Sequence, residues 1–371
     1  LNIIKLIGTD VKKIILGFMI ATAFLSMWIS NTATAVMILP VGIAVVLQLQ
    51  DNPNTIENEN SIFSKALMLA IAYSASIGGM ASLIGTPPNL VLAGVIEKSY
   101  GIELTFAKWF SFGFPISITF LIIAWLYLTK FAFKFKLKEF PGGITEIKKQ
   151  LNYLGKISFE EKMVLAVFLI TAVAWISRSL FLNQIIPSID DTIIAIISAI
   201  VLFIIPSRNK NEALLGWSDA TKLPWGILLL FGGGMAIALG FESSGLALWL
   251  GEQLKLLETI PLIILLFVII GFVNFLTEIT SNLATTAMLL PVLVSLANST
   301  GIHHNYLLVG ATVAASCAFM LPVATPPNAI VFGSGYLKIK DMLKIGILMN
   351  IISIILLTLI VYFILPLIWG F

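Results

Sequence analysis

A short run of polar residues, Ser30-Asn31-Thr32-Ala33-Thr34, interrupts apolar sequence on both sides. It has a second copy, Ser281-Asn282-Leu283-Ala284-Thr285, 251 positions later. We call these runs the first and second tip motifs. Hydroxyl and amide oxygens are suitable ligands for a hard cation, and the donor groups of the same side chains can bind the oxygens of a carboxylate or a sulfate. The two motifs therefore predict a site that holds a cation and an anion together without a buried Lys or Arg.

Each tip motif is followed by Thr-Pro-Pro-Asn, at residues 86–89 and again at residues 325–328. Proline lacks a backbone N–H and pushes the preceding residue out of helical geometry, so both sequences predict a break within a helix. A single Ser-Asn-Thr usually joins neighbouring membrane helices, and a single Pro-Pro is usually a kink. Four motifs in matching order instead indicate an internal repeat around a polar site.

The composition is typical of a membrane protein. Of the 371 residues, 58% are hydrophobic and 11% are charged, and the mean hydropathy is +1.02. Several apolar runs exceed the roughly 20 residues that cross a bilayer as a helix. The net charge of +3 gives no indication of a nucleic-acid partner, and a single cysteine excludes an intramolecular disulfide. We therefore expect an all-α polytopic membrane protein.

The first tip motif lies between two apolar arms, residues 14–29 and 33–49, each too short to cross about 30 Å of hydrocarbon comfortably. The pattern predicts re-entrant helical hairpins at residues 14–49 and 259–298. The Thr-Pro-Pro-Asn motifs predict two broken transmembrane helices, at residues 62–96 and 306–335. Further spans are expected at residues 107–129, 163–182, 191–205, 224–250 and 343–369.

These elements predict inverted-topology repeats: a first repeat at 1–130, a cytoplasmic connector at 131–162 and a second repeat at 163–371. The second repeat has three spans before its hairpin, whereas the first has residues 1–11. We therefore expect the chain to be truncated at its N-terminus by about three helices. In this layout 18 of the 22 Lys and Arg residues lie on one side, which should be cytoplasmic. The first hairpin then enters from the cytoplasm and the second from outside.

Two acidic residues, Glu242 and Glu278, lie deepest in apolar sequence and are candidates for a functional role. Glu278 occupies the position of Met27 in the other repeat, so a structural role stays open beside ion handling. Several tryptophans lie near the ends of predicted spans, where we expect them to anchor the protein at the membrane interface. They are Trp109, Trp175, Trp217, Trp225 and Trp369.

With these motifs the sequence resembles the divalent anion/sodium symporter family, and its bacterial dicarboxylate transporters in particular. The resemblance extends over essentially all 371 residues. It also includes Trp225-Gly226-Ile227-Leu228-Leu229-Leu230-Phe231-Gly232-Gly233-Gly234 and the run Cys-Ala-Phe-Met-Leu-Pro-Val-Ala-Thr-Pro-Pro-Asn at 317–328. Members of the family are homodimers in the lipid membrane, with a fixed scaffold and a transport domain that moves like an elevator. The resemblance implies the same arrangement for the full-length protein.

The resemblance also implies two sodium sites and a site for the transported anion. The repeat offset agrees with the sodium sites, because it pairs Ser26 with Thr277. The first sodium site would use Ser26, Ser30, Asn31 and the Gly85 carbonyl, and the second Thr277, Ser281, Asn282 and the Ala324 carbonyl. The substrate contacts would be Ser30, Asn31, Thr32, Thr86, Ser281, Asn282, Thr325 and Pro326.

One position departs from the family's pattern. Leu283 stands in the second tip motif where the dicarboxylate-transporting members typically carry Thr. Loss of a hydroxyl at the anion leaves one carboxylate less well held, so Leu283 weakens the assignment to dicarboxylates. Sodium ligation by Ser281 and Asn282 is unaffected.

We predict a sodium-coupled secondary active transporter, not an enzyme, that imports small dianions across the cytoplasmic membrane of a bacterium. C4-dicarboxylates such as succinate or malate are the expected substrates, and sulfate or another inorganic anion is the alternative. Sodium is the coupling ion, and no further cofactor is predicted. An anion channel is the alternative from a different class, although sealed hairpins argue against a continuous polar pore. The sequence offers no nucleophile, base and orienting group of the kind an enzyme needs.

Overall fold

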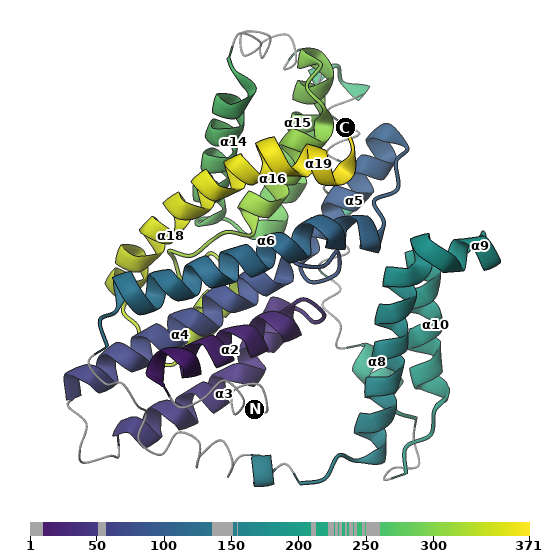
Figure 1. Cartoon of the computed structure of the whole chain (residues 1–371). Coiled ribbons are helices and arrows are strands. Elements are labelled where there is room, and N and C mark those ends of the chain that lie inside the picture. The colour runs from purple at the N-terminus through teal and green to yellow at the C-terminus, as the bar shows by residue number, and fades with distance from the viewer. Residues whose placement is uncertain are drawn as a thin grey trace.

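The computed structural model describes residues 10–50, 57–135, 151–153, 155–208, 213–221 and 260–371, and isolated positions between 226 and 249. Within these residues the chain is built from helices, with one isolated antiparallel bridge between Pro206 and Ala213 (Figure 1). Glu242, Trp225 and most of the predicted connector and of the predicted span 224–250 lie outside the described residues.

The first half of the chain contains two helices joined at the first tip motif and two more joined at the first Thr-Pro-Pro-Asn. They are followed by a long helix with a π-helical end. The elements are α2 (Val11–Ser26), α3 (Asn31–Gln50), α4 (Glu57–Gly79), α5 (Pro87–Tyr100), α6 (Phe106–Leu126) and η1 (Tyr127–Ala132).

The second half repeats this order after a pair of antiparallel helices. The pair and its neighbours are α8 (Phe159–Ser177), η2 (Arg178–Leu182), α9 (Asn183–Ile185), α10 (Asp191–Ile204) and α11 (Trp217–Ala220). The repeated elements are α14 (Leu262–Thr277), α15 (Asn282–Thr300), α16 (His304–Ala315), α17 (Pro326–Phe332), α18 (Ile339–Leu359), η4 (Ile360–Ile364) and α19 (Leu365–Trp369).

The arm that follows the first tip motif is longer than the predicted 33–49. Helix α3 has 20 residues and its counterpart α15 has 19, and Pro40 and Pro291 lie inside these helices without ending them. By length and composition both could cross a membrane, so the prediction that the arm 33–49 is too short to cross is wrong for α3. The first arms, α2 and α14, are short, with 16 residues each. Among the residues that the structure describes, the other segments long and apolar enough to span are Glu59–Gly79, Phe106–Ala132 and Ile339–Trp369.

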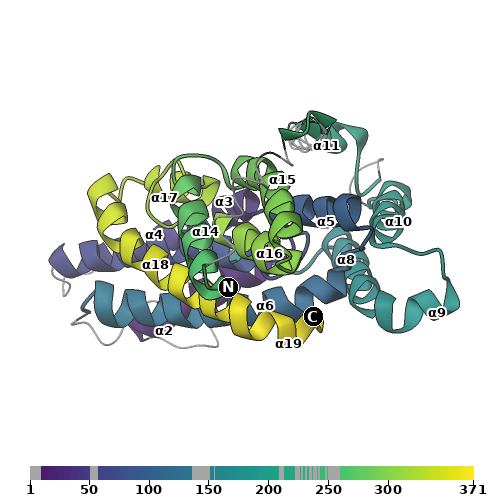
Figure 2. The same ribbon diagram turned by 90° about the horizontal axis from the view of Figure 1, so that it is seen from above.

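Helix pairs pack in the same way in both halves. Helices α2 and α3 both pack against α4, and α14 and α15 both pack against α16. The halves then cross over, since α3 packs against α17 while α15 packs against α5 (Figure 2). Each helix that begins at a tip motif therefore lies beside the short helix that follows the break of the other half.

Helix α4 is the most enclosed of the candidate spans, with 89% of its window buried inside the protein. A helix that is apolar on all sides suits a position surrounded by others. Small residues such as Ala70, Ala72 and Ala75 let neighbouring backbones approach closely. The first break therefore comes directly after the most buried of the candidate spans.

Polar contacts mark the two ends of the bundle. At one end, Lys65 Nζ lies 3.0 Å from Asp341 Oδ2, and the indole of Trp125 donates to the carbonyl of Lys12 over 2.9 Å. At the opposite end, the indole of Trp369 donates to the carbonyl of Lys108 over 3.1 Å. Lys12, Lys65 and the start of α18 therefore lie at the same end of the bundle.

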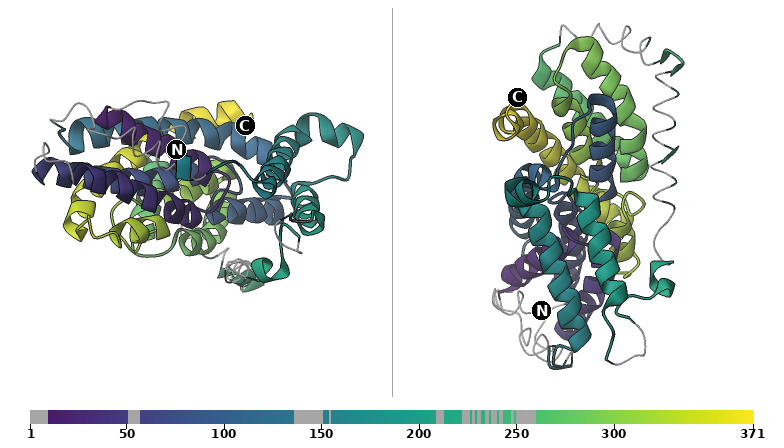
Figure 3. Two further views of the ribbon diagram at one scale, coloured as in Figure 1. Left: turned by 90° about the horizontal axis from the view of Figure 1, so that it is seen from below. Right: turned by 90° about the vertical axis from the view of Figure 1, so that its right-hand side faces the viewer.

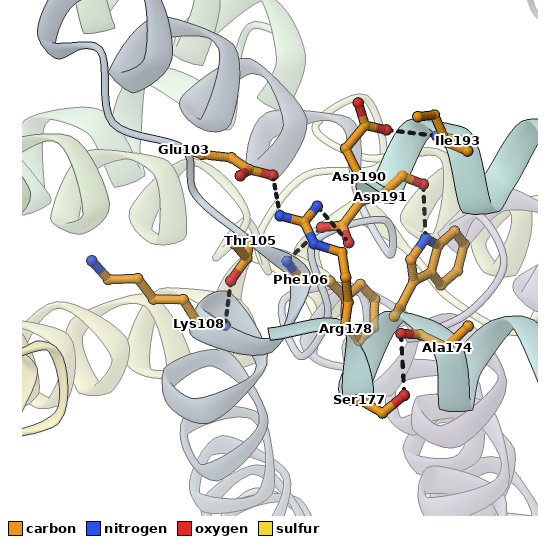
Figure 4. Close-up of polar contacts among 11 residues, drawn as sticks. Glu103, Thr105, Phe106, Lys108, Ala174, Ser177, Arg178, Asp190, Asp191 and Ile193 are labelled. Carbon is orange, nitrogen blue, oxygen red and sulfur yellow. Dashed lines mark hydrogen bonds and ion pairs between the residues drawn. The ribbon is translucent and has the colours of Figure 1, made fainter. Parts of the chain in front are cut away.

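Helices α8 and α10 form a pair beside the other helices (Figure 3), and an ion cluster joins the pair to the loop between α5 and α6 (Figure 4). Arg178 Nη2 lies 2.6 Å from Glu103 Oε1, and its Nη1 lies 3.1 Å from Asp191 Oδ1. The other oxygen of Asp191 accepts from the backbone N–H of Phe106 over 2.8 Å. The Arg178 side chain is 3% exposed, so this cluster is sealed from water on its cationic side.

Trp109 is not at the molecular surface, contrary to the prediction that it anchors the protein at the interface. It is fully buried near the start of α6, and its indole donates to the carbonyl of Met80 in the first break over 3.1 Å. A buried indole N–H needs an acceptor, and the interrupted end of α4 supplies one. Trp109 therefore stabilises the break.

Candidate functional site

The first tip motif brings three oxygens together. The hydroxyl oxygen of Ser26, the last residue of α2, lies 2.7 Å from Asn31 Oδ1 and 2.7 Å from the carbonyl oxygen of Ala75 on α4. A hydroxyl carries a single proton and donates to one acceptor at a time. An amide, a carbonyl and a hydroxyl oxygen thus share one proton, which is an arrangement suited to a small cation.

The second tip motif has the same arrangement. Thr277 Oγ1 at the end of α14 lies 2.9 Å from Asn282 Oδ1 and 2.9 Å from the carbonyl oxygen of Ala315 on α16. Ser26 and Thr277 are both fully buried. Ser26 and Thr277, which the repeat offset pairs, therefore make equivalent contacts in the two halves. The structure also adds two carbonyls, of Ala75 and Ala315, that the sequence analysis missed because any residue type can present a carbonyl.

Ser30 and Ser281 begin the helices that follow the tips. The Ser30 hydroxyl accepts from the backbone N–H of Ala33 over 3.3 Å, and the Ser281 hydroxyl accepts from that of Ala284 over 3.1 Å. Serine at this position satisfies one of the free N–H groups of a helix N-terminus. The remaining free N–H groups and the positive end of the helix dipole favour an anion in front of each tip.

Thr86 and Thr325 take equivalent positions at the two breaks. Each is the residue before a Pro-Pro pair, each is 2% exposed, and both have nearly the same extended backbone, with φ −143° and −139°. The Thr325 hydroxyl accepts from the backbone N–H of Asn328 over 3.3 Å. Thr86 makes no such capping bond.

Gly79 and Gly85 lie close to the first tip. A Cβ atom on Gly79 would collide with Asn31 Oδ1, and one on Gly85 would lie 2.5 Å from the carbonyl oxygen of Gly79. Gly85 thus lies against Gly79, which in turn lies against Asn31. The place of Gly85 in the first sodium site stays a prediction.

The carbonyl oxygens of Gly85 and Ala324 are notable for their lack of donors. Within the described part of the chain, no hydrogen bond to either oxygen is found. Both residues are buried. A carbonyl inside a protein usually has a hydrogen-bond donor or another positive partner.

The residues predicted to contact substrate differ in exposure. Ser30, Thr32, Ser281 and Pro326 are exposed, Asn31 and Asn282 are half-buried, and Thr86 and Thr325 are buried. Leu283 is half-buried and packs against the apolar core, whereas Thr32 at the matching place is exposed. The packing of α3 on α17 and of α15 on α5 places each tip helix beside the other half's break.

Glu278 is part of the scaffold of the second break. Its Oε1 accepts from the backbone N–H groups of Phe319 and Met320 over 2.8 and 2.9 Å, and its Oε2 accepts from that of Leu321 over 2.9 Å. The side-chain amide of Asn350 donates a fourth bond over 2.8 Å. The sequence leaves ion handling and a structural role open for Glu278, and these contacts indicate the structural role.

The other half holds its break without a carboxylate. The Ser82 hydroxyl donates to the carbonyl of Met27, the residue equivalent to Glu278. The Ser117 hydroxyl of α6 also donates to the carbonyl of Ile77 over 2.9 Å. Both halves therefore join the tip to the break at the same place with different groups.

Comparison with known proteins gives one family and several close relatives. Residues 1–369 match the family described as "Sodium:sulfate symporter transmembrane region". The chain is 46% identical over 376 residues to the sodium-dependent dicarboxylate transporter SdcS of Staphylococcus saprophyticus and 48% identical to that of Staphylococcus aureus strain USA300. In both comparisons the match covers 100% of this chain and 72% of the relative.

Proposed function

The chain belongs to the sodium:sulfate symporter family, and from this membership we propose that it is a sodium-coupled secondary transporter importing small dianions. C4-dicarboxylates such as succinate or malate are the proposed substrates, because relatives 46% and 48% identical are named sodium-dependent dicarboxylate transporters. The observation that carries the proposal is the duplicated oxygen triad: hydroxyl, amide and carbonyl oxygens meet at 2.7 to 2.9 Å in both halves.

Each triad forms the core of one proposed sodium site. Sodium prefers several oxygen ligands, and the donor-free carbonyls of Gly85 and Ala324 supply one more to each site. The first site comprises Ser26, Ser30, Asn31 and Gly85 with the Ala75 carbonyl, and the second comprises Thr277, Ser281, Asn282 and Ala324 with the Ala315 carbonyl. A single hydroxyl proton cannot bridge both acceptor oxygens of a triad at once. A sodium ion would instead contact the hydroxyl, amide and carbonyl oxygens together.

The dianion would lie between the two tips. The N-termini of α3 and α15 offer free N–H groups and dipoles of the right sign, and bound sodium would add positive charge nearby. Direct contacts are proposed for Ser30, Asn31, Thr32, Thr86, Ser281, Asn282, Thr325 and Pro326. Binding of the anion then depends on sodium, which is the basis of coupling.

The finer architecture is also part of the proposal. The units α2–α3 and α14–α15 are re-entrant hairpins, and α4–α5 and α16–α17 are broken transmembrane helices in two inverted repeats, 1–130 and 163–371, joined by a cytoplasmic connector at 131–162. The equivalent packing of the helices in both halves supports this assignment. The protein would function as a homodimer with an elevator motion in the cytoplasmic membrane of a bacterium, with the basic end in the cytoplasm.

Sulfate is a second candidate substrate because of Leu283. The apolar side chain packs against the core and offers no donor to the second carboxylate of a succinate. A compact inorganic dianion needs fewer contacts at that tip. Competition for uptake between unlabelled sulfate and succinate distinguishes the two candidate substrates.

The experiment is uptake of radiolabelled succinate by the full-length protein in proteoliposomes. An inward sodium gradient should drive accumulation above the equilibrium level, and replacement of sodium by potassium should abolish it. Equilibration without accumulation would indicate a channel. Unlabelled sulfate that competes more strongly than succinate would reassign the substrate.

The two sodium sites are tested by Asn31→Ala and Asn282→Ala. Each change removes one oxygen from a triad, so the half-saturating sodium concentration should rise about tenfold, which corresponds to about 1.4 kcal/mol. Sodium activation that stays unchanged in both variants would contradict the two-site assignment.

A further inference from the structure

Two asparagines, Asn89 and Asn328, make the same unusual pair of contacts. Each directly follows a Pro-Pro pair and is fully buried. The Asn89 amide donates to the carbonyls of Gly79 and Ser82 over 3.3 and 2.8 Å. The Asn328 amide donates to the carbonyls of Ala318 and Leu321 over 3.2 and 3.0 Å. In both halves the acceptors lie ten and seven residues before the asparagine.

The breaks create the need for these donors. A helix that ends inside the protein leaves its last carbonyls without their usual N–H partners. The two prolines that start the next helix have no N–H to offer. A side-chain amide has two donors, so one asparagine can hold two carbonyls of the same break.

The contacts also fix the residue proposed to ligate sodium. Four residues separate the second acceptor, Ser82 or Leu321, from the next helix, and the last of them is a threonine. They are residues 83–86 in one half and 322–325 in the other. Gly85 and Ala324 are within these segments, and their carbonyls accept no hydrogen bond from the described residues. A short segment held at both ends can keep an unpartnered carbonyl in one orientation.

Stability alone does not account for the choice of asparagine. The side-chain oxygens of both Asn89 and Asn328 are buried and have no hydrogen-bond partner among the described residues. A buried acceptor without a donor lowers stability. Both halves carry the cost of this unpartnered side-chain oxygen. In both halves the asparagine uses the two N–H groups of its side-chain amide to hold the equivalent pair of carbonyls.

We propose that Asn89 and Asn328 are positioning residues for sodium, each holding one break so that the carbonyl of Gly85 or Ala324 points at its ion. The inference rests on the proposed function, since it needs two sodium sites. It assigns one asparagine to each site: Asn89 to the first and Asn328 to the second. Neither asparagine touches the ion.

The variants Asn89→Leu and Asn328→Leu keep the size of the side chain and remove both donors. Each should raise the half-saturating sodium concentration for succinate uptake about tenfold, or about 1.4 kcal/mol. The maximal rate at saturating sodium should stay close to that of the unaltered transporter. Asn→Ser variants, which keep one donor, should give a smaller rise and serve where a leucine variant does not fold.

Sodium binding is also measured without transport. The melting temperature of the purified protein is recorded against sodium concentration, because an ion that binds the folded state stabilises it. The variants should need about tenfold more sodium for the same shift. Ser74→Ala on α4 and Thr312→Val on α16 are matched controls, since these buried hydroxyls bond to carbonyls of their own helices. Both should retain normal sodium dependence.

Double variants distinguish a positioning role of Asn89 from a general loosening of the protein. Asn89→Leu combined with Ser26→Ala should show a non-additive effect on half-saturating sodium, while Asn89→Leu combined with Thr277→Ala should be additive. Folded variants with unchanged sodium half-saturation, or with equal coupling to both sites, would overturn the proposal. If the unaltered protein shows no sodium-dependent uptake or stabilisation, the proposed function itself fails, whatever the variants do.

Discussion

Leu283 is the residue at which the two tips differ most. Thr32 is exposed and can give its hydroxyl to a carboxylate, while Leu283 is half-buried against the core. A hydrogen bond to a charged group contributes roughly 1.5 to 3 kcal/mol. Leu283→Thr should therefore lower the half-saturating concentration of succinate by about tenfold and leave that of sodium nearly unchanged.

Kinetics of succinate uptake at saturating sodium measure this effect. Loss of transport, or an unaltered affinity for succinate, would mean that Leu283 serves helix packing alone. Thr32→Leu in the other tip is the matched control, and it should weaken succinate binding.

His304 lies outside the predicted membrane spans, and its lowered pKa should make the stability of the folded protein depend on pH. Burial, with smaller effects of His303 and Lys108, lowers the pKa of His304 from 6.5 to about 4. Between these two values the unfolded chain binds more protons than the folded one. The stabilisation is therefore complete above pH 6.5 and is lost as the pH falls towards 4.

The melting temperature of the detergent-solubilised protein should accordingly fall between pH 6.5 and 4. His304→Gln should make this decline shallower. His304 stacks on Tyr100, with ring centroids 3.9 Å apart, so the variant is compared with itself at pH values above 6.5. An identical decline in variant and unaltered protein would exclude His304 as the group that titrates.

The sequence predicts the side chains of the site better than it predicts their partners. Asn31 and Asn282 follow from the repeated motif, because a duplicated pattern of side chains is visible in sequence, whereas Ser26 and Thr277 are implied by the family resemblance, with which the repeat offset agrees. The carbonyls of Ala75 and Ala315 follow from neither, because backbone oxygens are the same in every residue and reach the tips over 49 and 38 positions.

At the scale of elements, the helix junctions show the same limit. The sequence predicts the hairpins, the breaks and their order. It does not predict that Trp109 points into the first break, because packing against neighbouring helices decides this. Glu278 is likewise ambiguous until the backbone N–H groups of the second break surround its carboxylate.

Arg178 joins the α8–α10 pair to the loop before α6 through its ion pairs with Glu103 and Asp191. Removal of Arg178 would leave Asp191, with a side chain 23% exposed, facing Glu103 without a counter-charge. Breaking a buried ion pair in this way costs about 3 to 5 kcal/mol. Arg178→Met should therefore increase hydrogen exchange in α8 and α10 far more than in α4.

Glu103→Gln is the companion variant. Its side chain is 52% exposed, so the loss should be about 1 kcal/mol or less. Equal exchange in α8 after both changes would show that the aromatic contacts, such as Phe106 on Trp175 at 5.3 Å, hold the pair without Arg178.

At the scale of the whole molecule, the distribution of charge determines orientation. Lys65, Asp341 and the start of α18 lie at one end, and Lys108 and the end of α19 lie at the other. The positive-inside rule places the first end in the cytoplasm. Since α2 starts at the basic end, whereas α15 and α16 meet at the opposite end, the two hairpins would open to opposite sides.

Single cysteines test this orientation. The native Cys317 is fully buried, so it should contribute little background to labelling by a membrane-impermeant thiol reagent. Lys340→Cys and Lys98→Cys replace exposed residues at the two ends. We expect Lys98→Cys to react in intact cells, and Lys340→Cys to react in inside-out vesicles alone. Labelling of both from one side would contradict the inverted arrangement, and the reverse pattern would invert the orientation, because the two residues lie at opposite ends of the bundle.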